Sequence, residues 1–469
     1  MRPTRALGRL LADRLGLAPV AKHLLDHPIP EENAGGKGWM YVLGASTLVA
    51  FLVQLVTGAA LATMYVPSPT HAWESLRVIN EETTLGPVLR GLHFYGASAM
   101  VILIFLHMAR VFLTGSYKYP REATWISGGF LLGLVLAMAA TGQLLRWDQD
   151  GIWSVIVWAK FAERTPLVGP YIAQFFLAGE TVGGATLTRF FAFHVFIFPG
   201  LIILLVIAHL YLVVHHGISE PPRAGHPVEP STYRRWYQAL LERGRPYWPY
   251  GVWREAVAGA AVVAMVLALA LLLGPKGPGA PPDATEVRAV PKPDWFFLWY
   301  YTLVWLKPPA LERLIMVYFP LGVGVVLFLI PLFWNTGERH PGRRPWAVAT
   351  VGVTVLVWAT LTAFGVFPYW VPDFETRPLP AEAVPGTDPV VHAGAQIFFE
   401  RGCQYCHAVR EYGGEYGPDL TRVAKRLSPE EITVRIVNGI RNMPAYRGTL
   451  SIAELDAVVA FLRALGEEG

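Results

Sequence analysis

The chain has 469 residues, of which 53% are hydrophobic and 16% are charged, whereas about 25% of residues are charged in an ordinary soluble protein. This composition excludes a single soluble globular domain. Because 39 basic residues nearly balance 35 acidic ones, the charge gives no reason to expect nucleic acid as a partner. The two cysteines are Cys403 and Cys406, so a disulfide framework is excluded for the apolar part of the chain.

Seven apolar stretches are each long enough to cross about 30 Å of hydrocarbon at about 1.5 Å per residue. They comprise residues 39–64, 90–114, 124–144, 190–214, 253–274, 311–334 and 346–369. The segment 1–38 alternates basic and apolar residues and has no small-residue cleavage site. We therefore expect this segment to lie on the membrane surface rather than to be a removable signal. The fold class is an all-α membrane protein.

The basic residues in the connections predict the topology. The connections after the second, fourth and sixth stretches carry Lys118, Arg121, Arg223, Arg234, Arg235, Arg243, Arg245, Arg339, Arg343 and Arg344. The positive-inside rule places these connections, and with them the N-terminus, in the cytoplasm. Seven crossings then leave the C-terminus outside the cell.

Four histidines lie inside two of the apolar stretches. His93 and His107 are 14 residues apart, and His194 and His209 are 15 apart. One such histidine could be a polar side chain bonded across two helices, but an imidazole in hydrocarbon is costly and four at matched spacing favour metal ligands. Each pair lies broadly on one helix face, about 21 Å apart along the axis. We expect two non-covalent b haems with two histidine ligands each, His93 with His194 near the outer surface and His107 with His209 near the inner one.

Glycines on the two neighbouring stretches repeat the same interval. Gly44 and Gly58 are 14 residues apart, as are Gly128 and Gly142. Glycine permits the close approach of a flat ligand, although tight helix packing is a common alternative in membranes. Matching intervals favour haem clearance.

The polar C-terminal region contains Cys403-Gln-Tyr-Cys406-His407, the attachment signature of a c-type haem. His407 would be the proximal ligand. A thioredoxin-like dithiol is the alternative, but it does not need this histidine. Met443 is the expected sixth ligand because it is the only methionine after Pro385, and Pro418 could orient His407 through its carbonyl.

Residues 30–370 resemble the cytochrome b subunits of quinol-oxidising cytochrome bc and b6f complexes, and the C-terminal part resembles a class I cytochrome c. The matching motifs are Phe51-Leu-Val-Gln-Leu-Val-Thr-Gly58, Arg110-Val-Phe-Leu-Thr-Gly115, Pro120-Arg121-Glu122, Trp147-Asp148-Gln149, Thr186-Leu-Thr-Arg189-Phe190 and Pro293-Asp294-Trp295-Phe296. The domains that this implies are an interfacial segment (1–38), a diheme four-helix bundle (39–216), a three-helix region (217–371), a linker (372–389) and a cytochrome c domain (390–469).

The resemblance implies an outer quinol-oxidising site at Pro293, Asp294, Trp295 and Phe296. The family's usual sequence there is Pro-Glu-Trp-Tyr, whose glutamate takes a quinol proton, so Asp294 is one methylene shorter. A carboxylate can still act as the base. The family's b6f branch attaches an extra haem to a cysteine at the position of Val42, so no covalent extra haem is expected here.

Other site residues have open alternatives. Arg90, Arg110 and Arg189 lie near the haem ligands and could pair with propionates or extend to the interface. Asp26, His27, His215 and His216 are candidates for an inner quinone-reducing site, and contact with lipid headgroups is the alternative.

We therefore expect a fused cytochrome b and c subunit of a bacterial quinol:cytochrome c oxidoreductase in the cell membrane. It would need a separate Rieske iron–sulfur protein, and its electrons would pass to a cytochrome c or a terminal oxidase; a homodimer is a family expectation. A diheme membrane anchor of a dehydrogenase or hydrogenase is one alternative, although the last three apolar stretches count against it. A non-catalytic haem-bearing sensor or assembly protein is the other.

Overall fold

The computed structural model describes residues 25–179, 181–283, 285–286, 292–367, 377–414, 417–440 and 443–467. Most of the expected interfacial segment and residues 372–376 of the expected linker lie outside these residues. Within them, seven helices are long and apolar enough to span a membrane, at Gly36–Ala62, Gly86–Leu113, Glu122–Leu144, Gly184–His216, Val252–Leu273, Leu314–Phe333 and Pro345–Val366. All seven expected spans are therefore confirmed as helices of spanning length, with ends shifted by a few residues.

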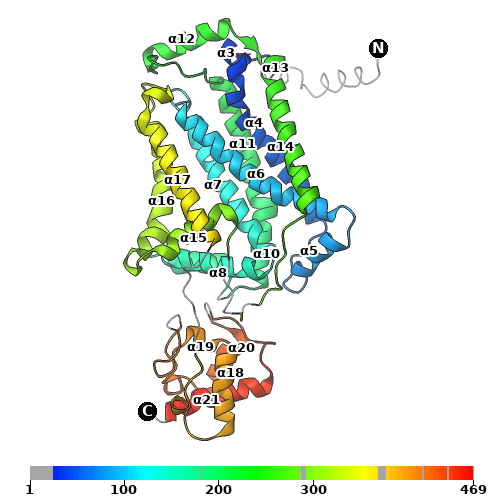
Figure 1. The fold of residues 1–469 in the computed structure, drawn as a ribbon, viewed down its shortest axis with the longest axis vertical. Coiled ribbons are helices and arrows are strands. Elements are labelled where there is room, and N and C mark those ends of the chain that lie inside the picture. The colour runs from blue at the N-terminus through cyan, green and yellow to red at the C-terminus, as the bar shows by residue number, and fades with distance from the viewer. Residues whose placement is uncertain are drawn as a thin grey trace.

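Four of these helices form a bundle (Figure 1). They are α4 (Val42–Ala62), α6 (Gly86–Leu113), α7 (Glu122–Leu144) and α11 (Phe198–His216). Helix α4 packs along α6, and α11 packs along α7, while α14 (Val252–Leu273) covers α4 and α6. Apolar side chains such as Ala50, Val101, Val135 and Ile202 are buried between them, whereas most side chains of the bundle's outer faces remain exposed as lipid-facing residues would be.

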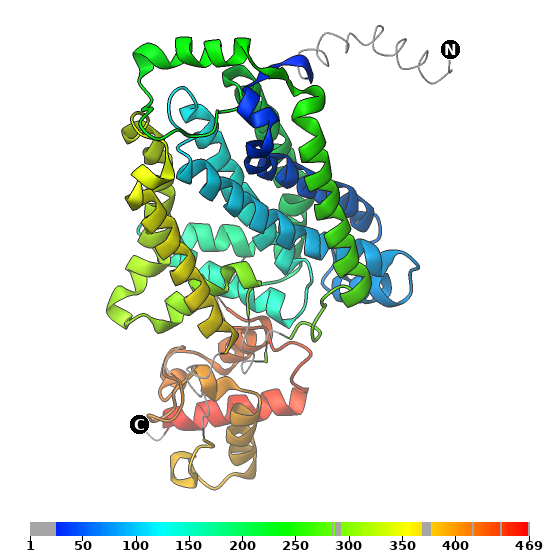
Figure 2. The same ribbon diagram turned by 45° about the horizontal axis from the view of Figure 1, so that its top comes forward.

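The remaining long helices flank this bundle. Helix α15 (Trp295–Leu306) packs against α17 (Pro345–Val366), and α16 (Phe319–Phe333) lies along α7. The short helices gather at the two ends of the molecule (Figures 1 and 2). We call them the α8 end, where α5, α8, α10 and α15 lie beside the C-terminal domain, and the α12 end, where α3, α12 and α13 lie.

The elements at the α8 end are α5 (Ala72–Glu81), α8 (Gln149–Glu163), α9 (Gly169–Leu177), α10 (Gly184–Ala192) and η3 (Pro309–Leu311). Those at the α12 end are β1 (Pro28–Ile29), α3 (Glu31–Ala34), η1 (Gly36–Tyr41), α12 (Pro230–Glu242), β2 (Arg245–Pro246), α13 (Tyr247–Tyr250) and η5 (Pro341–Arg343). Strands β1 and β2 pair antiparallel. Single helical turns, η2 (Phe193–Ile197) and η4 (Leu314–Tyr318), precede α11 and α16.

The three basic connections meet at the α12 end. The amide of Tyr119 donates to the carbonyl of Asn335 at 2.9 Å, and Val228 and Gly337 exchange backbone hydrogen bonds of 2.9 Å. Beneath α12, the buried carboxylate of Glu220 accepts from Tyr233 Oη at 2.8 Å and forms an ion pair with Arg339. The connections that the charge pattern predicts to share one side of the membrane are thus joined to one another.

The C-terminal domain is a small helical unit. Its elements are η6 (Ala381–Ala383), α18 (Pro389–Glu400), α19 (Cys403–Cys406), η7 (Val423–Lys425), α20 (Pro429–Asn438) and α21 (Ile452–Glu467). Helices α18 and α21 cross with Phe398 and Phe461 in contact, and both rings are fully buried. Helix α20 begins with a capping box between Ser428 and Glu431, which satisfies amides at its first turn. This domain has its own hydrophobic core.

Candidate functional site

His93 and His194 face each other inside the bundle near the α8 end. Their ring centres are 6.2 Å apart. A metal–imidazole bond is about 2 Å long, and the bonding nitrogen lies about 1 Å from the ring centre. Two imidazoles that hold one metal ion between them therefore have centres about 6 Å apart. The separation in this chain fits a bis-histidine metal centre.

Hydroxyl groups fix the orientation of three of the four histidines. Thr57 Oγ1 lies 2.9 Å from His93 Nδ1, Thr141 Oγ1 lies 3.1 Å from His194 Nδ1, and Ser127 Oγ lies 2.9 Å from His209 Nδ1. Each hydroxyl also lies within hydrogen-bond distance of a carbonyl of its own helix, to which it donates its single proton.

These bonds determine the tautomer of the imidazoles. A hydroxyl whose proton is already donated can only accept, so Nδ1 of each histidine carries the proton. Nε2 then has a free lone pair, which is the form that binds a metal. Each of the three hydroxyl residues directly precedes a glycine of the 14-residue pattern, and this position is the signal in the sequence for its role.

His107 and His209 lie toward the α12 end of the same two helices. They are within electrostatic range of each other. Among the described residues, no hydroxyl contacts His107, because the residue before Gly44 is Leu43. The second pair therefore has one hydroxyl-bonded histidine where the first pair has two.

A wide turn explains why the second histidine interval is one residue longer than the first. Residues Phe193–Ile197 form a π-helical turn that includes His194. Pro199 follows at the start of α11; proline has no amide proton, so the regular hydrogen-bond ladder is interrupted there. A π-turn absorbs one extra residue, so the 15 residues from His194 to His209 cover about the rise of 14.

The four patterned glycines face the four histidines. A Cβ atom at Gly58 would lie 3.1 Å from His93 Cε1, at Gly44 3.2 Å from His107 Cε1, at Gly128 3.4 Å from His209 Cε1 and at Gly142 2.7 Å from His194 Cε1. The glycines thus leave space for the imidazole rings. They would help a flat ligand to bind only through the placement of these rings.

The three arginines near the histidines differ in their partners. Arg90 donates to Asn80 Oδ1 and to the carbonyls of Gly277 and Lys276, and Arg189 donates to the carbonyl of Phe175. Arg110 instead stacks over the ring of Tyr41 at 3.8 Å, and its Nε and Nη2 are buried without a hydrogen-bond partner. Because a buried guanidinium needs an acceptor, Arg110 is the arginine best suited to an anionic group such as a haem propionate.

Asp294 begins α15 at the α8 end. Its carboxylate is 23% exposed and lies 3.8 Å from Arg146 Nη1, and its amide donates to Gln143 Oε1 at 3.3 Å. Burial raises the pKa of Asp294, while Arg146 lowers it. A carboxyl with a raised pKa in a partly exposed position has the character of a proton acceptor. The sequence analysis named neither Gln143 nor Arg146.

Three aromatic residues follow Asp294 at the start of α15. Trp295 Nε1 donates to Ser98 Oγ at 3.2 Å, and Phe296 is buried in the bundle core. Helix α8 lies opposite, where Trp158 contacts Phe297 at 6.1 Å between ring centres. Pro293 precedes this segment and is buried. Trp295 and Phe296 therefore face the bundle, and the next residue, Phe297, contacts α8.

The inner quinone candidates have separate partners at the α12 end. His27 stacks on Tyr247 at 4.7 Å, and His215 stacks on Tyr211 at 5.7 Å. The carbonyl of His216 accepts from Arg121, and Asp26 is exposed. His215 and His216 also contact each other, with ring centres 4.9 Å apart. The role of the four candidates in an inner quinone site stays a prediction.

In the C-terminal domain, Cys403 and Cys406 occupy the two ends of one helical turn, α19. His407 follows, and its Nδ1 lies 2.8 Å from the carbonyl of Pro418, which is the contact expected from the sequence. Burial raises the pKa of the Cys403 thiol to about 12, whereas reactive dithiols have a lowered pKa. Met443 packs against the domain's core.

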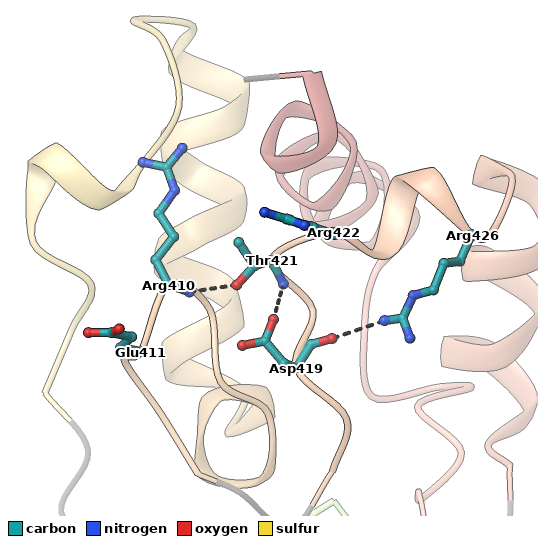
Figure 3. Close-up of a pocket in the computed structure, with 6 residues that line it drawn as sticks. All are labelled: Arg410, Glu411, Asp419, Thr421, Arg422 and Arg426. Atoms are coloured by element: carbon teal, nitrogen blue, oxygen red, sulfur yellow. Dashed lines mark hydrogen bonds between the residues drawn. The ribbon is translucent and has the colours of Figure 1, made fainter. Parts of the chain in front are cut away.

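A cavity of about 530 Å³ lies beside the Pro418 loop. Figure 3 shows its lining residues, Arg410, Glu411, Asp419, Thr421, Arg422 and Arg426. Thr421 Oγ1 accepts from the Arg410 amide and its own amide donates to Asp419 Oδ1, both at 2.7 Å. These bonds fix the loop that presents the Pro418 carbonyl to His407.

The fold, with its seven long apolar helices, defines a multi-pass membrane protein. Residues 35–217 match the family model described as Cytochrome b/b6/petB. The chain is 39% identical over 206 residues to cytochrome b6 of Heliomicrobium gestii, which covers 44% of this chain and 95% of that protein. The chain therefore belongs to the cytochrome b family.

Other known proteins are also similar to this chain. The menaquinol:cytochrome c reductase cytochrome b subunit of Geobacillus thermodenitrificans is 37% identical over 214 residues, or 45% of this chain and 95% of that protein. A solved structure titled "Hyperthermophilic respiratory Complex III" shares the fold, with a TM-score of 0.61, 24% identity, and coverage of 76% of this chain and 91% of the other. Residues 389–462 match the model described as Cytochrome C oxidase, cbb3-type, subunit III. This chain is a cytochrome b fused to a cytochrome c domain.

Proposed function

We propose that the chain is the cytochrome b and c subunit of a respiratory quinol:cytochrome c oxidoreductase in a bacterial cell membrane. The α8 end would face outward and the α12 end the cytoplasm, in agreement with the basic residues of the α12-end connections. The observation that carries the proposal is the 6.2 Å separation of the His93 and His194 rings. His194 lies in η2, directly after α10, and Asp294 directly precedes α15. Helices α10 and α15 both lie at the α8 end.

When bound, the two b haems supply one-electron transfer along the bundle, and the c haem supplies it at the outer surface. His93 with His194, and His107 with His209, would hold the b haems between helices, with Arg110 on a propionate of the inner one. Cys403 and Cys406 would attach the c haem, and His407 and Met443 would bind its iron. Val42 provides no thiol for an additional covalent haem.

Asp294 would take a proton from quinol at the outer site. Its raised pKa makes this carboxylate a stronger proton acceptor than an ordinary aspartate. Arg146, 3.8 Å away, would keep enough of the carboxyl ionised to accept it. Trp295 and Phe296 would shape the apolar wall against which the quinol ring lies.

The two electrons of quinol would go to two different acceptors, and one of these would be a Rieske iron–sulfur protein. Both cysteines belong to the haem c motif, so a Rieske iron–sulfur cluster would come from a separate subunit. That protein would pass its electron to the tethered haem c, whose linker raises its effective concentration. The other electron would cross the bundle to a quinone at the inner side, with proton uptake from the cytoplasm, and the complex would be a homodimer in contact with membrane lipid.

Quinol-dependent reduction of cytochrome c by the purified complex tests this proposal. We expect activity that is abolished by an inhibitor of the outer quinol site. Asp294→Asn should lose most of this activity while keeping its haem spectrum. A complex with intact haems and no quinol oxidation would instead indicate a sensor or an assembly protein.

A further inference from the structure

The C-terminal domain carries a basic patch beside the loop that orients His407. The patch consists of four cations and the two carboxylates that lie between them in the sequence: Arg410, Arg422, Lys425, Arg426, Glu411 and Asp419. All of these except Lys425 line the cavity shown in Figure 3. Lys425 lies on η7, three residues after Arg422. Because side chains three residues apart share one face of a 3₁₀ turn, Lys425 extends the patch.

The positive charge of the patch is not neutralised by ion pairs. Within the part of the chain that the structure describes, the side chains of Arg422 and Lys425 form no hydrogen bond and no ion pair. Arg426 Nη2 donates to the backbone carbonyl of Asp419 at 3.0 Å rather than to its carboxylate. The carboxylate of Asp419 accepts from the amide of Thr421 at 2.7 Å. Both Arg422 and Lys425 are exposed, so their charges are available to a partner.

The patch is fixed relative to the haem-attachment motif. A tight turn carries Arg410, and it begins two residues after His407. Val409 and Tyr412 close this turn by exchanging backbone hydrogen bonds of 2.9 Å. The Arg410 amide donates to Thr421 Oγ1 at 2.7 Å, which joins the turn to the loop before Arg422. A protein bound to the patch would therefore be held close to the c haem.

The composition of this surface indicates the chemistry of its partner. An excess of cations attracts a partner of opposite charge and raises its rate of association. Arginine and aromatic residues also contribute most to binding at protein interfaces, and Tyr412, which follows Glu411, is 44% exposed. We infer that the basic patch is the docking surface for an electron-accepting protein whose redox centre is surrounded by carboxylates.

This inference rests on the proposed function, and it deepens it by giving the chemistry of the electron acceptor. The patch guides and holds the acceptor, but its exposed cations take no part in quinol oxidation. Loss of these cations should therefore raise the KM for an acidic acceptor and leave the turnover at saturating acceptor unchanged. Because salt screens charges over about 10 Å at 0.1 M, this KM should also rise with ionic strength.

Reduction of two forms of one cytochrome c by the purified complex tests the inference. The donor is quinol, and the complex is kept in a neutral detergent. One acceptor is a basic mitochondrial cytochrome c, and the other is the same protein with its lysines succinylated, so that haem and size match and the charge is opposite. We expect kcat/KM for the succinylated form to fall with rising salt, whereas kcat/KM for the basic form should not fall.

Arg422→Glu together with Lys425→Glu should lower kcat/KM for the succinylated form by about tenfold at low salt. The same variant should raise kcat/KM for the basic form. Arg435→Glu is the control for Arg422→Glu, because Arg435 is exposed in the last turn of α20 and undergoes the same change of charge. It should change both values much less. An unchanged c-haem spectrum shows that each variant is folded.

A kcat/KM for the succinylated form that does not respond to salt would overturn the inference, as would equal losses in Arg422→Glu and Arg435→Glu. An effect of the patch that is seen only in vesicles of anionic lipid would also overturn it, because the cations would then bind the membrane surface. Each of these results leaves the proposed function intact, since quinol is still oxidised. A complex with intact haems that oxidises no quinol would refute the function itself.

Discussion

The carboxylate of Asp294 lies 3.8 Å from the guanidinium of Arg146, across the junction between α7 and α15. Burial raises the pKa of this carboxyl, Asp148 and Asp150 raise it further, and Arg146 opposes all three. Because a base must be deprotonated, activity should fall as the pH drops through this raised pKa. The decline of the quinol oxidation rate at low pH, its acid limb, should therefore lie at a higher pH than the pKa of an ordinary aspartate, which is about 3.9.

Arg146→Gln should move that acid limb to higher pH, because the variant removes the cation that lowers the pKa of Asp294. Arg146→Lys keeps the charge and is the control, which should move the limb less. The measurement is the pH profile of the quinol oxidation rate. An acid limb that stays in place or moves to lower pH in Arg146→Gln would show that Asp294 does not act as the proton acceptor.

Asp294→Asn should lower the rate of quinol oxidation by about 10²- to 10⁴-fold, which is the usual contribution of a general base. Asp294→Glu restores a carboxyl, one methylene longer, and should retain more activity. Steady-state assays on complexes with matched haem content measure the effect. If Asn and Glu variants are equally active, the carboxylate has no part in the reaction.

The α7 glycines allow a graded test of the histidine pockets. Gly142→Ala places a Cβ 2.7 Å from His194 Cε1, Gly128→Ala places one 3.4 Å from His209 Cε1, and Gly133 has nothing within 4 Å. We expect Gly142→Ala to weaken retention of one b haem by about 10- to 100-fold, as for the loss of a ligand-orienting contact. Gly128→Ala should have a small effect and Gly133→Ala none. Haem content per protein measures this order, and a reversed order would contradict the pocket geometry.

Covalent haem attachment is separable from the bundle. Replacing both Cys403 and Cys406 with serine should abolish haem that stays bound through a denaturing gel. Because the C-terminal domain has its own core, the b-haem spectrum should persist. Haem staining of the gel and a difference spectrum of the membranes provide the two readings, and covalent haem in the double variant would place the attachment site elsewhere.

The buried ion pair at the α12 end sets the stability of the connections. Glu220 and Arg339 have side chains that are 7% and 3% exposed, so Arg339→Met leaves a buried carboxylate without its cation. We expect a loss of about 3–5 kcal/mol in the free energy of unfolding. In Glu220→Leu with Arg339→Met, much of this loss should be recovered.

The exposed pair of Arg77 and Glu74, 34% and 46% exposed, is the control. Arg77→Met should cost much less stability than Arg339→Met, because water screens an exposed ion pair. Thermal unfolding of the purified complex compares the variants. If Arg339→Met and Arg77→Met are equally mild, the α12-end pair carries no special stability.

The sequence predicts the seven membrane spans well because each is a long apolar run. It predicts less well the short helices at the α8 end and the α12 end of the molecule. Helix α8 carries charges and a polar start at Asp148, and α12 is polar on one side with Tyr233 and Tyr237 buried on the other. Neither has a run of spanning length. Their positions depend on contacts with distant segments, which a single sequence does not display.

In the candidate site too, features that repeat along one helix could be predicted, whereas contacts between helices could not. Histidine and glycine spacing predicted the elements that hold the four imidazoles, because a regular interval can be read along one helix. The π-turn at His194 depends on a missing amide at Pro199, and the partners of the imidazoles lie on other helices. Thr57, Ser127 and Thr141 each precede a patterned glycine in the sequence, but their contacts with the imidazoles depend on how the helices pack against one another.

The most direct test of the central claim is a redox-titrated difference spectrum of the purified complex. We predict two b-type haems with separate midpoint potentials for each covalently bound c-type haem in this chain. Fewer than two b haems per c haem would contradict the assignment of His93 with His194 and His107 with His209 as two metal-binding pairs.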